Sequence, residues 1–319
     1  MKKIIKLFVN IINYGRVTFF DYKRYLVQAV NLNNTDSLEG KIVKKTHSLE
    51  KRLSFENPDS SYGKSKVFQL IDLLRKYEVK EGKNNIIEDW SVSVICQMIE
   101  NYFNDEEKYL FENKTKNIAA FHKLNSDKSI GGYFTVKKKS ITDTEFSSFK
   151  DLAFSRHSIR SFIGPVPDYY IEQAAKVALK SPSNCNLQPI KIYKINNKDK
   201  LNKILQLQRG NKGFTSEIHQ LIVFVANLSN YSGFRERNQC YIDTGIFSVT
   251  FAYALHDLGY GSCMLNWAST INEDISINRI LNLPKYHIVT LTMATGDMAD
   301  NLKIPRSLRR KPKEIIYTV

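Results

Sequence analysis

The chain has 319 residues, of which 42% are hydrophobic and 25% are charged, and its formal net charge is +15. This length and composition suit a soluble globular protein with one or two domains. Basic residues outnumber acidic ones by 26 to 19 over residues 1–150 and by 21 to 13 over residues 151–319, so the excess is not a basic tail. A diffuse excess can attract anions, but no zinc-finger spacing or aromatic RNA-binding motif accompanies it. We therefore expect no nucleic-acid partner.

The cysteines and histidines give no sign of a metal site. The four cysteines stand alone, with no C-x-x-C pair, and the six histidines are scattered. Neither zinc ligation nor a thioredoxin-like motif is indicated. Isolated cysteines fit a reducing compartment, and we expect a cytoplasmic protein.

Residues 1–25 are predicted to form an amphipathic helix with basic residues on its polar parts. These are Lys2, Lys3, Lys6, Arg16, Lys23 and Arg24. The apolar run is short, Asn10 and Asn13 interrupt it, and no small-residue cleavage site follows, so it is not typical of a signal peptide or a membrane span. The helix could lie on an anionic membrane surface. We favour packing against the protein's own body or a dimer partner.

The rest of the first 115 residues also has mostly helical periodicity. Residues 67–77 and 90–103 carry apolar stripes, and Gly82 to Asn85 separates them. We expect these stripes to bury against the catalytic body or a partner. Residues 125–147 are polar and turn-rich, which is typical of a linker or a surface strap.

From residue 148 onward, helices and strands alternate. The pattern predicts helices over residues 168–179 and 243–258, the second ending at Gly259. It predicts strands over residues 190–195, 221–226, 261–265, 288–294 and 315–319. The fold class is therefore α+β, with a mixed or antiparallel sheet wrapped by helices.

Two motifs in this half concentrate polar chemistry. Residues 155–162 read SRHSIRSF and place two guanidiniums, an imidazole and a hydroxyl within five positions. Guanidiniums suit phosphate because they offer a planar fork of donors, and free amides would add to the anion site if the stretch opened a helix. Residues 181–189 read SPSNCNLQP and present small polar groups stiffened by prolines. Taken alone, the first could be a solvated basic face and the second a polar turn.

Together, the two motifs resemble the flavin-binding signatures of the nitroreductase family, in the family's order and at about its spacing. The resemblance covers roughly residues 148–319 and implies bound FMN. It implies that Arg156 and Ser158 hold the phosphate and ribityl end of FMN, with His157 nearby. It also implies that Arg160 faces the N1/C2 edge of the ring, where a cation stabilises the reduced flavin.

The second motif has a different implied role, because in the family it covers the flavin of the other subunit. A homodimer is therefore implied. The residues that match this segment are Pro182, Ser183, Asn184 and Asn186.

Three further segments resemble the family. Asn211 is the candidate amide against the pyrimidine edge of the ring. Leu265 and Asn266 stand where a backbone N–H approaches flavin N5. Arg306 and Arg309 belong to a basic cluster that closes on the phosphate, and Arg310 competes with Arg309 for that role.

The resemblance implies an FMN-dependent NAD(P)H oxidoreductase. NADH or NADPH would reduce the flavin through N5, and the reduced flavin would pass hydride to a small nitro, quinone or other electrophilic acceptor in a ping-pong reaction. Two alternatives stay open. One is a flavin-dependent dehydrogenase or dehalogenase that uses no nicotinamide, and the other is a non-catalytic flavin-binding scaffold. The sequence names neither the acceptor nor the preferred nicotinamide.

The domains expected are a helical N-terminal extension and linker over residues 1–147 and an FMN-binding domain over residues 148–319. Residues 46–54, THSLEKRLS, look like a segment of extended family members, some of them linked to surface-polysaccharide genes. His47 and Glu50 could reach a substrate there, but we favour a surface helix. We expect the apolar helices of the extension to border the entrance of the flavin pocket as a lid.

Overall fold

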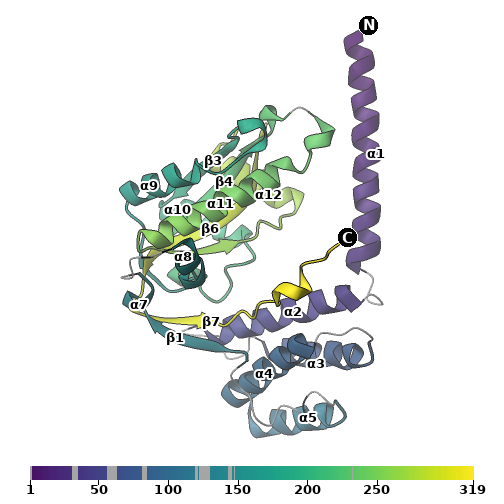
Figure 1. Cartoon of the computed structure of the whole chain (residues 1–319), viewed down its shortest axis with the longest axis vertical. Coiled ribbons are helices and arrows are strands. Elements are labelled where there is room, and N and C mark those ends of the chain that lie inside the picture. Colours follow the sequence, from purple (N-terminus) through teal and green to yellow (C-terminus); the bar gives the residue numbers. More distant parts are fainter. Residues whose placement is uncertain are drawn as a thin grey trace. The chain divides into compact units, whose positions relative to one another are not determined.

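The computed structural model describes residues 2–30, 35–55, 63–80, 85–118, 121, 130–142, 146, 148–231 and 233–319. The chain forms two compact units (Figure 1). The first, here the sheet unit, comprises Met1–Val17 and Val136–Leu302; the second, here the helical unit, comprises Thr18–Thr135 and Lys303–Val319. Compactness thus groups Lys303–Val319 with the N-terminal helices, although the sequence prediction counted these residues in the FMN-binding domain.

The sheet unit is built on five strands in the order β2-β6-β4-β3, with β5 also paired to β6. Their bounds are β2 Phe162–Gly164, β3 Ile190–Ile195, β4 Gln220–Asn227, β5 Gly261–Leu265 and β6 His287–Met298. All of these pairings are antiparallel. The long strand β6 pairs with β4 on one side and with β5 and β2 on the other, so β3 lies at the edge opposite β5.

The central strand β4 is buried on both faces because helices cover both sides of the sheet. Every residue of β4 except the last is buried. Ile222 and Phe224 pack with α11 (Gln239–Asp257) and α9 (Asp168–Ala178) in one apolar cluster. Successive strand side chains alternate between faces, so Leu221 and Val223 point to the other face. There α12 (Ile271–Leu281) contacts β6 and α10 (Lys198–Leu207). The expected α+β class, with helices around an antiparallel sheet, is confirmed.

Two glycines of the sheet unit are required by the backbone. Gly259 follows α11 with φ 85°. The N–H of Gly259 donates to His256 O and that of Tyr260 donates to Leu255 O, which is the Schellman pattern, so the predicted helix end is confirmed. Gly296 in β6 lies so close to β2 that an added Cβ would stand 2.6 Å from the carbonyl oxygen of Gly164.

Short elements complete the sheet unit. They are α7 Lys139–Thr142, α8 Phe149–Ser155, and the 3-10 turns η1 Asn184–Asn186, η2 Thr215–Glu217, η3 Leu228–Asn230 and η4 Phe234–Glu236. The helical unit contains the 3-10 turn η5 Pro312–Glu314.

The helical unit has its own core. Its helices are α2 Thr35–Leu53, α3 Lys64–Glu78, α4 Asn85–Tyr102 and α5 Asp105–Thr115, whereas α1 Lys2–Val30 spans the division between the units. The predicted helices over residues 67–77 and 90–103 are confirmed as α3 and α4. Their apolar stripes pack on α2 and on each other. The expectation that they bury against the catalytic body or a partner is therefore wrong, and the predicted break at Gly82–Asn85 lies mostly outside the described residues.

The segment Thr46–Ser54 was expected to be a surface helix, and this is also wrong. It forms the C-terminal half of α2, where Thr46, Leu49, Glu50 and Arg52 are fully buried. The helix sits between α3 and α4, so most of its sides are covered. Its polar residues are therefore interior groups and must find partners inside the protein.

Two predictions about strands differ from the structure. The expected linker over residues 125–147 contains β1 (Tyr133–Lys137), which pairs with β7 (Asn301–Pro305), and α7. Residues 125–129, 143–145 and 147 of it lie outside the described part. The predicted strand over residues 315–319 is absent: η5 is followed by exposed, irregular chain. Ile, Tyr and Val favour strands, but only where a neighbouring strand pairs with them.

Candidate functional site

The loop Arg156–Arg160 lies against β5. Arg156 caps the C-terminus of α8, and Ser158 forms a parallel bridge with Ser262. The N–H of Ile159 donates to the carbonyl oxygen of Ser262 at 3.0 Å. The idea that this stretch opens a helix is therefore wrong. A helix C-terminus carries partial negative charge, so any anion bound here would be attracted by the guanidiniums and not by free helix amides.

The two guanidiniums of the loop remain available to a ligand. Arg156 lies 5.8 Å from the ring centre of Tyr253, and Arg160 Nη1 donates to the carbonyl oxygen of Ser158 at 3.2 Å. Both residues are half-buried. Within the described part of the chain, neither forms an ion pair with a carboxylate. Half-buried cations without a carboxylate partner fit an external anion.

A neutral histidine supports the start of the loop. His256 of α11 is 2% exposed, and its Nε2 lies 2.9 Å from Ser155 Oγ. Burial, followed by the charges of Arg156 and His157, lowers the pKa of His256 to about 4. At neutral pH the imidazole is therefore uncharged and acts as a hydrogen-bonding support for the end of α8.

The end of β5 is fixed by a residue that the sequence did not single out. Gln208 Nε2 donates to Asn266 O at 2.8 Å and to Thr292 Oγ1 at 3.2 Å, and Gln208 Oε1 accepts from the N–H of Gly210. Thr292 Oγ1 in turn donates to Leu265 O at 3.0 Å. Gln208 thus ties the chain after β5 to the loop after α10. The sequence did contain a sign that Gln208 is buried, because it stands four residues after Ile204 and continues the helical spacing of the buried residues Leu201, Ile204 and Leu205.

Asn211 lies in this same loop, and one N–H of its side-chain amide is bonded within the protein. Asn211 Nδ2 donates to Leu205 O at 2.9 Å, and the residue is 3% exposed. Its backbone oxygen accepts from Thr215 Oγ1 at 3.0 Å. The side chain therefore shapes the loop from inside. An added Cβ on Gly210 would lie 3.5 Å from Leu265 Cδ2, which places the loop beside the end of β5.

The structure therefore brings three predicted segments together around β5: residues 156–160, 208–211 and 265–266. The segment Pro182–Asn186 is not among them. It leads into β3, at the opposite edge of the sheet. Within one chain, the two motifs that define the resemblance lie on different edges of the same sheet.

The segment before β3 is anchored by two acids that the sequence did not identify as site residues. Asp243 of α11 is 2% exposed and accepts hydrogen bonds from the N–H of Asn184, from Tyr231 Oη and from Gln239 Nε2 at 3.1, 2.9 and 3.0 Å. Glu236 accepts from Asn184 Nδ2 at 2.9 Å. Burial, followed by the hydrogen bond to Asp243, raises the pKa of Tyr231, so this phenol stays a donor.

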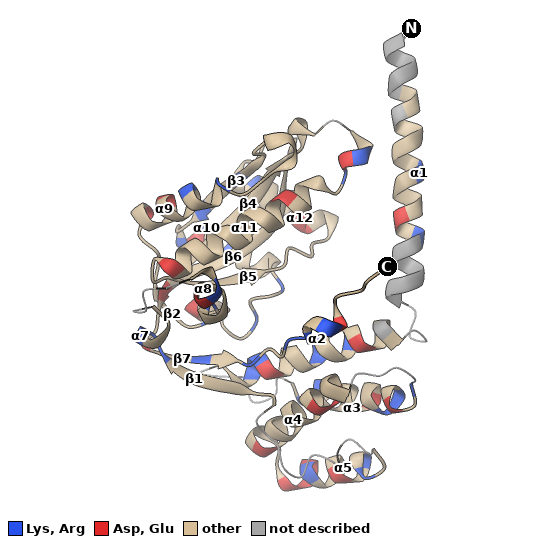
Figure 2. Cartoon of the chain, viewed as in Figure 1, with Lys and Arg blue, Asp and Glu red and all other residues tan. Residues whose placement is uncertain are grey.

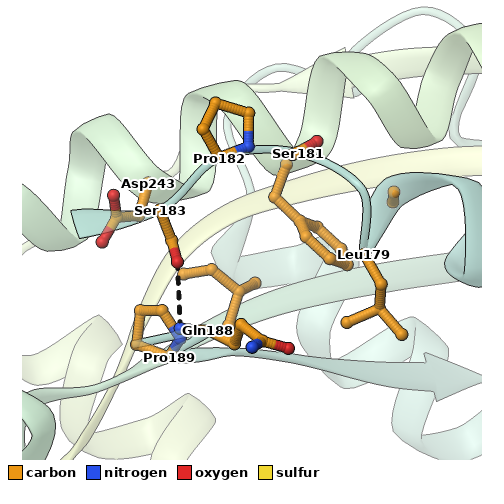
Figure 3. A pocket seen from close by; sticks show the side chains of 10 residues that line it. Leu179, Ser181, Pro182, Ser183, Gln188, Pro189 and Asp243 are labelled. Carbon is orange, nitrogen blue, oxygen red and sulfur yellow. Dashed lines mark hydrogen bonds between the residues drawn. The ribbon is translucent and has the colours of Figure 1, made fainter. Parts of the chain in front are cut away.

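This segment holds an unusual backbone and faces outward. Cys185, Asn186 and Gln188 have φ of 46°, 57° and 47°, in the left-handed region, and all three are exposed. Such conformations persist when surrounding contacts impose them. The N–H of Gln188 donates to Ser183 Oγ at 3.0 Å, over a small cavity lined in part by Pro182, Pro189 and Asp243 (Figure 3). The anchors thus hold an exposed, polar segment in a left-handed conformation.

A comparison with known protein families finds one match in this region. Residues 153–212 match the sequence model described as the nitroreductase family, and they include both motifs. The chain carries a nitroreductase-family segment. This confirms the resemblance stated from the two motifs.

Solved structures similar to this chain align with about half of it. A nitroreductase family protein from Streptococcus pneumoniae TIGR4 is 18% identical, with 54% of this chain and 100% of that chain covered and a TM-score of 0.48. An FMN-dependent nitroreductase from Clostridium difficile R20291 is 21% identical, with 50% and 90% covered and a TM-score of 0.42. A nitroreductase family protein from Clostridium novyi NT is 21% identical, with 48% and 86% covered and a TM-score of 0.43. No curated protein matches the chain.

The basic cluster after β7 lies outside the nitroreductase-family segment and is bound into the helical unit. The N–H of Arg306 donates to Gly132 O at 3.0 Å, Arg309 Nη1 donates to Ser307 O, and Arg310 Nη2 pairs with Glu39 Oε2 at 3.0 Å. Of the three guanidiniums, that of Arg310 is therefore neutralised by a carboxylate. This favours Arg309 over Arg310 as the cation left for an anionic ligand.

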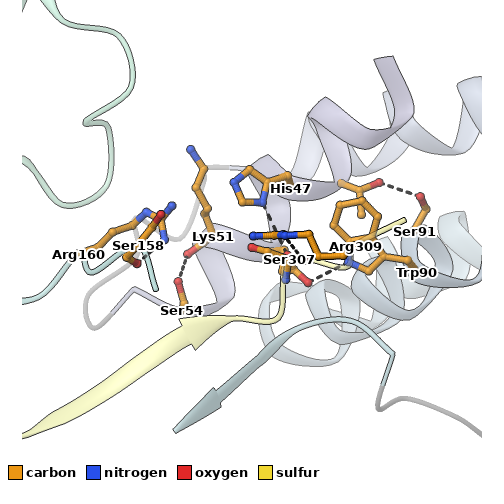
Figure 4. A network of polar contacts seen from close by, with 11 residues as sticks. His47, Lys51, Ser54, Trp90, Ser91, Ser158, Arg160, Ser307 and Arg309 are labelled. Carbon is orange, nitrogen blue, oxygen red and sulfur yellow. Dashed lines mark hydrogen bonds and ion pairs between the residues drawn. The ribbon is translucent and has the colours of Figure 1, made fainter. Parts of the chain in front are cut away.

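In the helical unit, the segment that carries this cluster is hydrogen-bonded to a buried polar network around Glu50 (Figure 4). Glu50 is fully buried and accepts from Trp90 Nε1 at 2.9 Å and from the N–H of Ser307 at 3.1 Å, with His47 Nδ1 at 3.7 Å. Glu50 therefore faces the interior of its own unit. Its partners give it a structural part in seating the C-terminal segment, in place of the substrate contact considered from the sequence.

Proposed function

We propose that the sheet unit binds FMN and works as an FMN-dependent NAD(P)H oxidoreductase in the cytoplasm, acting on a small nitro, quinone or other electrophilic acceptor. The observation that carries this proposal is the loop Arg156–Arg160. It belongs to the nitroreductase-family segment, it holds two half-buried cations, and it lies beside the β5 strand that ends at Leu265. A dianionic phosphate with a planar polar ring fits that combination of groups.

The residues present fit this cofactor at both of its ends. Arg156 and Ser158 would hold the phosphate and ribityl end, with His157 beside them, and Arg160 would lie along the N1/C2 edge of the ring. The backbone at Leu265 and Asn266 would lie near N5 of the ring, as the resemblance implies, and Gln208 holds the carbonyl of Asn266 in place. Asn211 supports this loop from inside, and Arg306 and Arg309 would add positive charge.

When bound, FMN would supply the chemistry, taking two electrons from NADH or NADPH and passing them to the acceptor. The protein would orient the ring and stabilise its charge. A guanidinium at the N1/C2 edge stabilises negative charge on a reduced flavin more than on the oxidised one, because the charge develops there on reduction. Arg160 is thus the residue that would raise the reduction potential.

The segment with Pro182, Ser183, Asn184 and Asn186 supports a homodimer. It lies at the sheet edge opposite β5 and exposes its left-handed residues. In one chain it therefore does not meet the loop Arg156–Arg160. A two-fold partner could bring this segment over the site of the first protomer, since an isologous interface exchanges the same surface in both directions.

Steady-state oxidation of NADH and NADPH by the FMN-loaded protein tests the proposal. We expect oxidation with menadione or a nitroaromatic as acceptor, and parallel lines in double-reciprocal plots because the two half-reactions share one pocket. If neither nicotinamide reduces the bound flavin, the oxidoreductase proposal is wrong. A flavin-dependent enzyme without nicotinamide would then be separated from a scaffold by whether dithionite-reduced protein transfers electrons to any acceptor.

A further inference from the structure

Helix α1 exposes an apolar stripe to solvent. Phe8, Ile11, Phe19 and Tyr22 are 64%, 59%, 68% and 60% exposed. Their positions, together with Ile12 and Gly15, follow helical spacing and lie along one side of the helix. A stripe of large apolar side chains is normally covered by another surface.

The opposite side of the helix is the one that the protein partly covers. Asn13, Val17 and Asp21 are four residues apart and are each half-buried, whereas their described neighbours on α1 are exposed. The stripe therefore faces away from the half-buried side of the helix. This arrangement is the reverse of a helix that packs on its own protein. The expected packing of α1 was on the protein's own body or on a dimer partner; within this chain the stripe itself is uncovered, although Tyr14 contacts Phe234 with ring centres 5.9 Å apart.

The charges near this stripe are basic. Arg16 and Lys23 are exposed at its edge. The acid of α1, Asp21, is on the half-buried side. An outward surface with aromatic and aliphatic side chains flanked by cations has the composition of an interfacial membrane helix, in which long basic side chains reach the headgroups.

The charge beside the stripe matches an anionic surface. Arg16 and Lys23 border the stripe, and the whole chain carries +15 with Lys and Arg on both units (Figure 2). An anionic lipid surface has the complementary sign. Among the residues that the structure describes, no helix is long and apolar enough to cross a bilayer. We propose that α1 lies in the plane of an anionic membrane surface, with its apolar stripe inserted among the headgroups.

Co-sedimentation of the full-length, FMN-loaded protein with vesicles tests this proposal. We expect the protein to pellet with vesicles of equal parts phosphatidylcholine and phosphatidylserine and to stay in solution with pure phosphatidylcholine vesicles. Added salt should release it, because screening weakens the attraction between cations and anionic lipid. Failure to pellet with the anionic vesicles at low salt would overturn the proposal.

Two matched variants identify the surface. The double variant Ile11→Ser and Tyr22→Ser should lower the vesicle partition coefficient by about tenfold or more, since each change removes an inserted apolar side chain. The control Tyr109→Ser and Leu110→Ser removes similarly exposed side chains from α5 and should leave partitioning unchanged. Equal loss in both pairs would contradict the assignment. If the Ile11/Tyr22 pair lowers the mass measured by light scattering in the absence of lipid, a second copy covers the stripe and the proposal is wrong.

Discussion

At the scale of single residues, buried polar side chains fix the loops of the sheet unit. Gln208 joins the chain after β5 to the loop after α10, Asp243 holds the segment before β3, and His256 supports the end of α8. Each of them forms a hydrogen bond with a backbone or hydroxyl group of the segment that it holds. The geometry of the candidate site therefore depends on residues that would not touch the cofactor.

His256 should make the stability of the protein depend on pH. Its pKa in the folded protein, about 4, is below the 6.5 of an ordinary histidine. Between these values the unfolded chain binds more protons, so stability is complete above pH 6.5 and is lost as the pH falls toward 4. The loss should be about 3 kcal/mol. Urea unfolding across this range measures it.

The variant His256→Gln should remove most of that slope, because it keeps a hydrogen-bonding side chain and removes the titrating group. His287 provides the comparison, since burial and Lys191 also lower its pKa. The variant His287→Gln should remove a smaller part. An unchanged slope in the His256 variant would show that another group is responsible.

The sequence identified part of the site for a simple reason. Residues 155–162 and 181–189 concentrate unusual residue types, and such density is visible without a structure. Gln208 and Asp243 are single polar residues on helices or at their ends, and only packing reveals which strand or loop each one meets. Asn211 was correctly placed in the loop, but the sequence could not show that its amide donates to Leu205.

At the scale of elements, α11 controls the segment before β3. We expect Asp243→Asn to lower the free energy of unfolding by about 2 kcal/mol, because hydrogen bonds to a charged acceptor contribute about 1.5–3 kcal/mol. It should also make the segment more susceptible to proteolysis at Pro182–Gln188, whose strained backbone loses its anchor. Urea unfolding and limited proteolysis measure the two effects.

The control is Asp257→Asn, which changes an exposed carboxylate at the other end of the same helix. Its effect on stability should stay within about 0.5 kcal/mol. Equal effects of the two substitutions would mean that Asp243 is not an anchor.

In the helical unit, removal of the Glu50 side chain should lower the free energy of unfolding. Glu50→Ala leaves Trp90 Nε1 and the N–H of Ser307 without their acceptor, and we expect destabilisation by about 3 kcal/mol. Trp90 fluorescence in a Trp267→Phe background follows the unfolding of this unit, since the chain has two tryptophans. The exposed Glu106 of α5 gives the control, and Glu106→Ala should have little effect. A stable Glu50 variant with unchanged fluorescence would contradict this role.

The elements that could be predicted were those with strong apolar periodicity. The strand over residues 190–195 has the predicted bounds, and α9 and α11 differ from prediction by a few residues, because apolar alternation and helical stripes are properties of the sequence. The strand predicted over residues 315–319 does not form, because it depends on pairing with a neighbouring strand, which the sequence of the segment does not reveal. The idea that residues 156–160 begin a helix was wrong, because their polar composition suits the end of a helix as well as its beginning.

At the scale of the whole molecule, we expect a homodimer. Phe149 and Phe154 of α8 and Tyr241 and Val249 of α11 expose apolar side chains that a partner would cover. Light scattering should give twice 36.9 kDa, with an interface above roughly 2,000 Å². Val249→Asp on α11 should weaken the dimer, whereas Ile275→Asp on α12 should not. A monomer that retains FMN would contradict the shared site.

Titration of FMN into flavin-free protein measures whether the loop Arg156–Arg160 binds this cofactor. We expect a yellow complex that releases FMN, and not FAD, on denaturation. Arg156→Ala should weaken binding by about 1.5–3 kcal/mol, the contribution of a charged hydrogen bond, whereas the exposed control Arg279→Ala should bind normally. A folded protein that binds no FMN, or equal affinity in the wild type and the Arg156 variant, would contradict it.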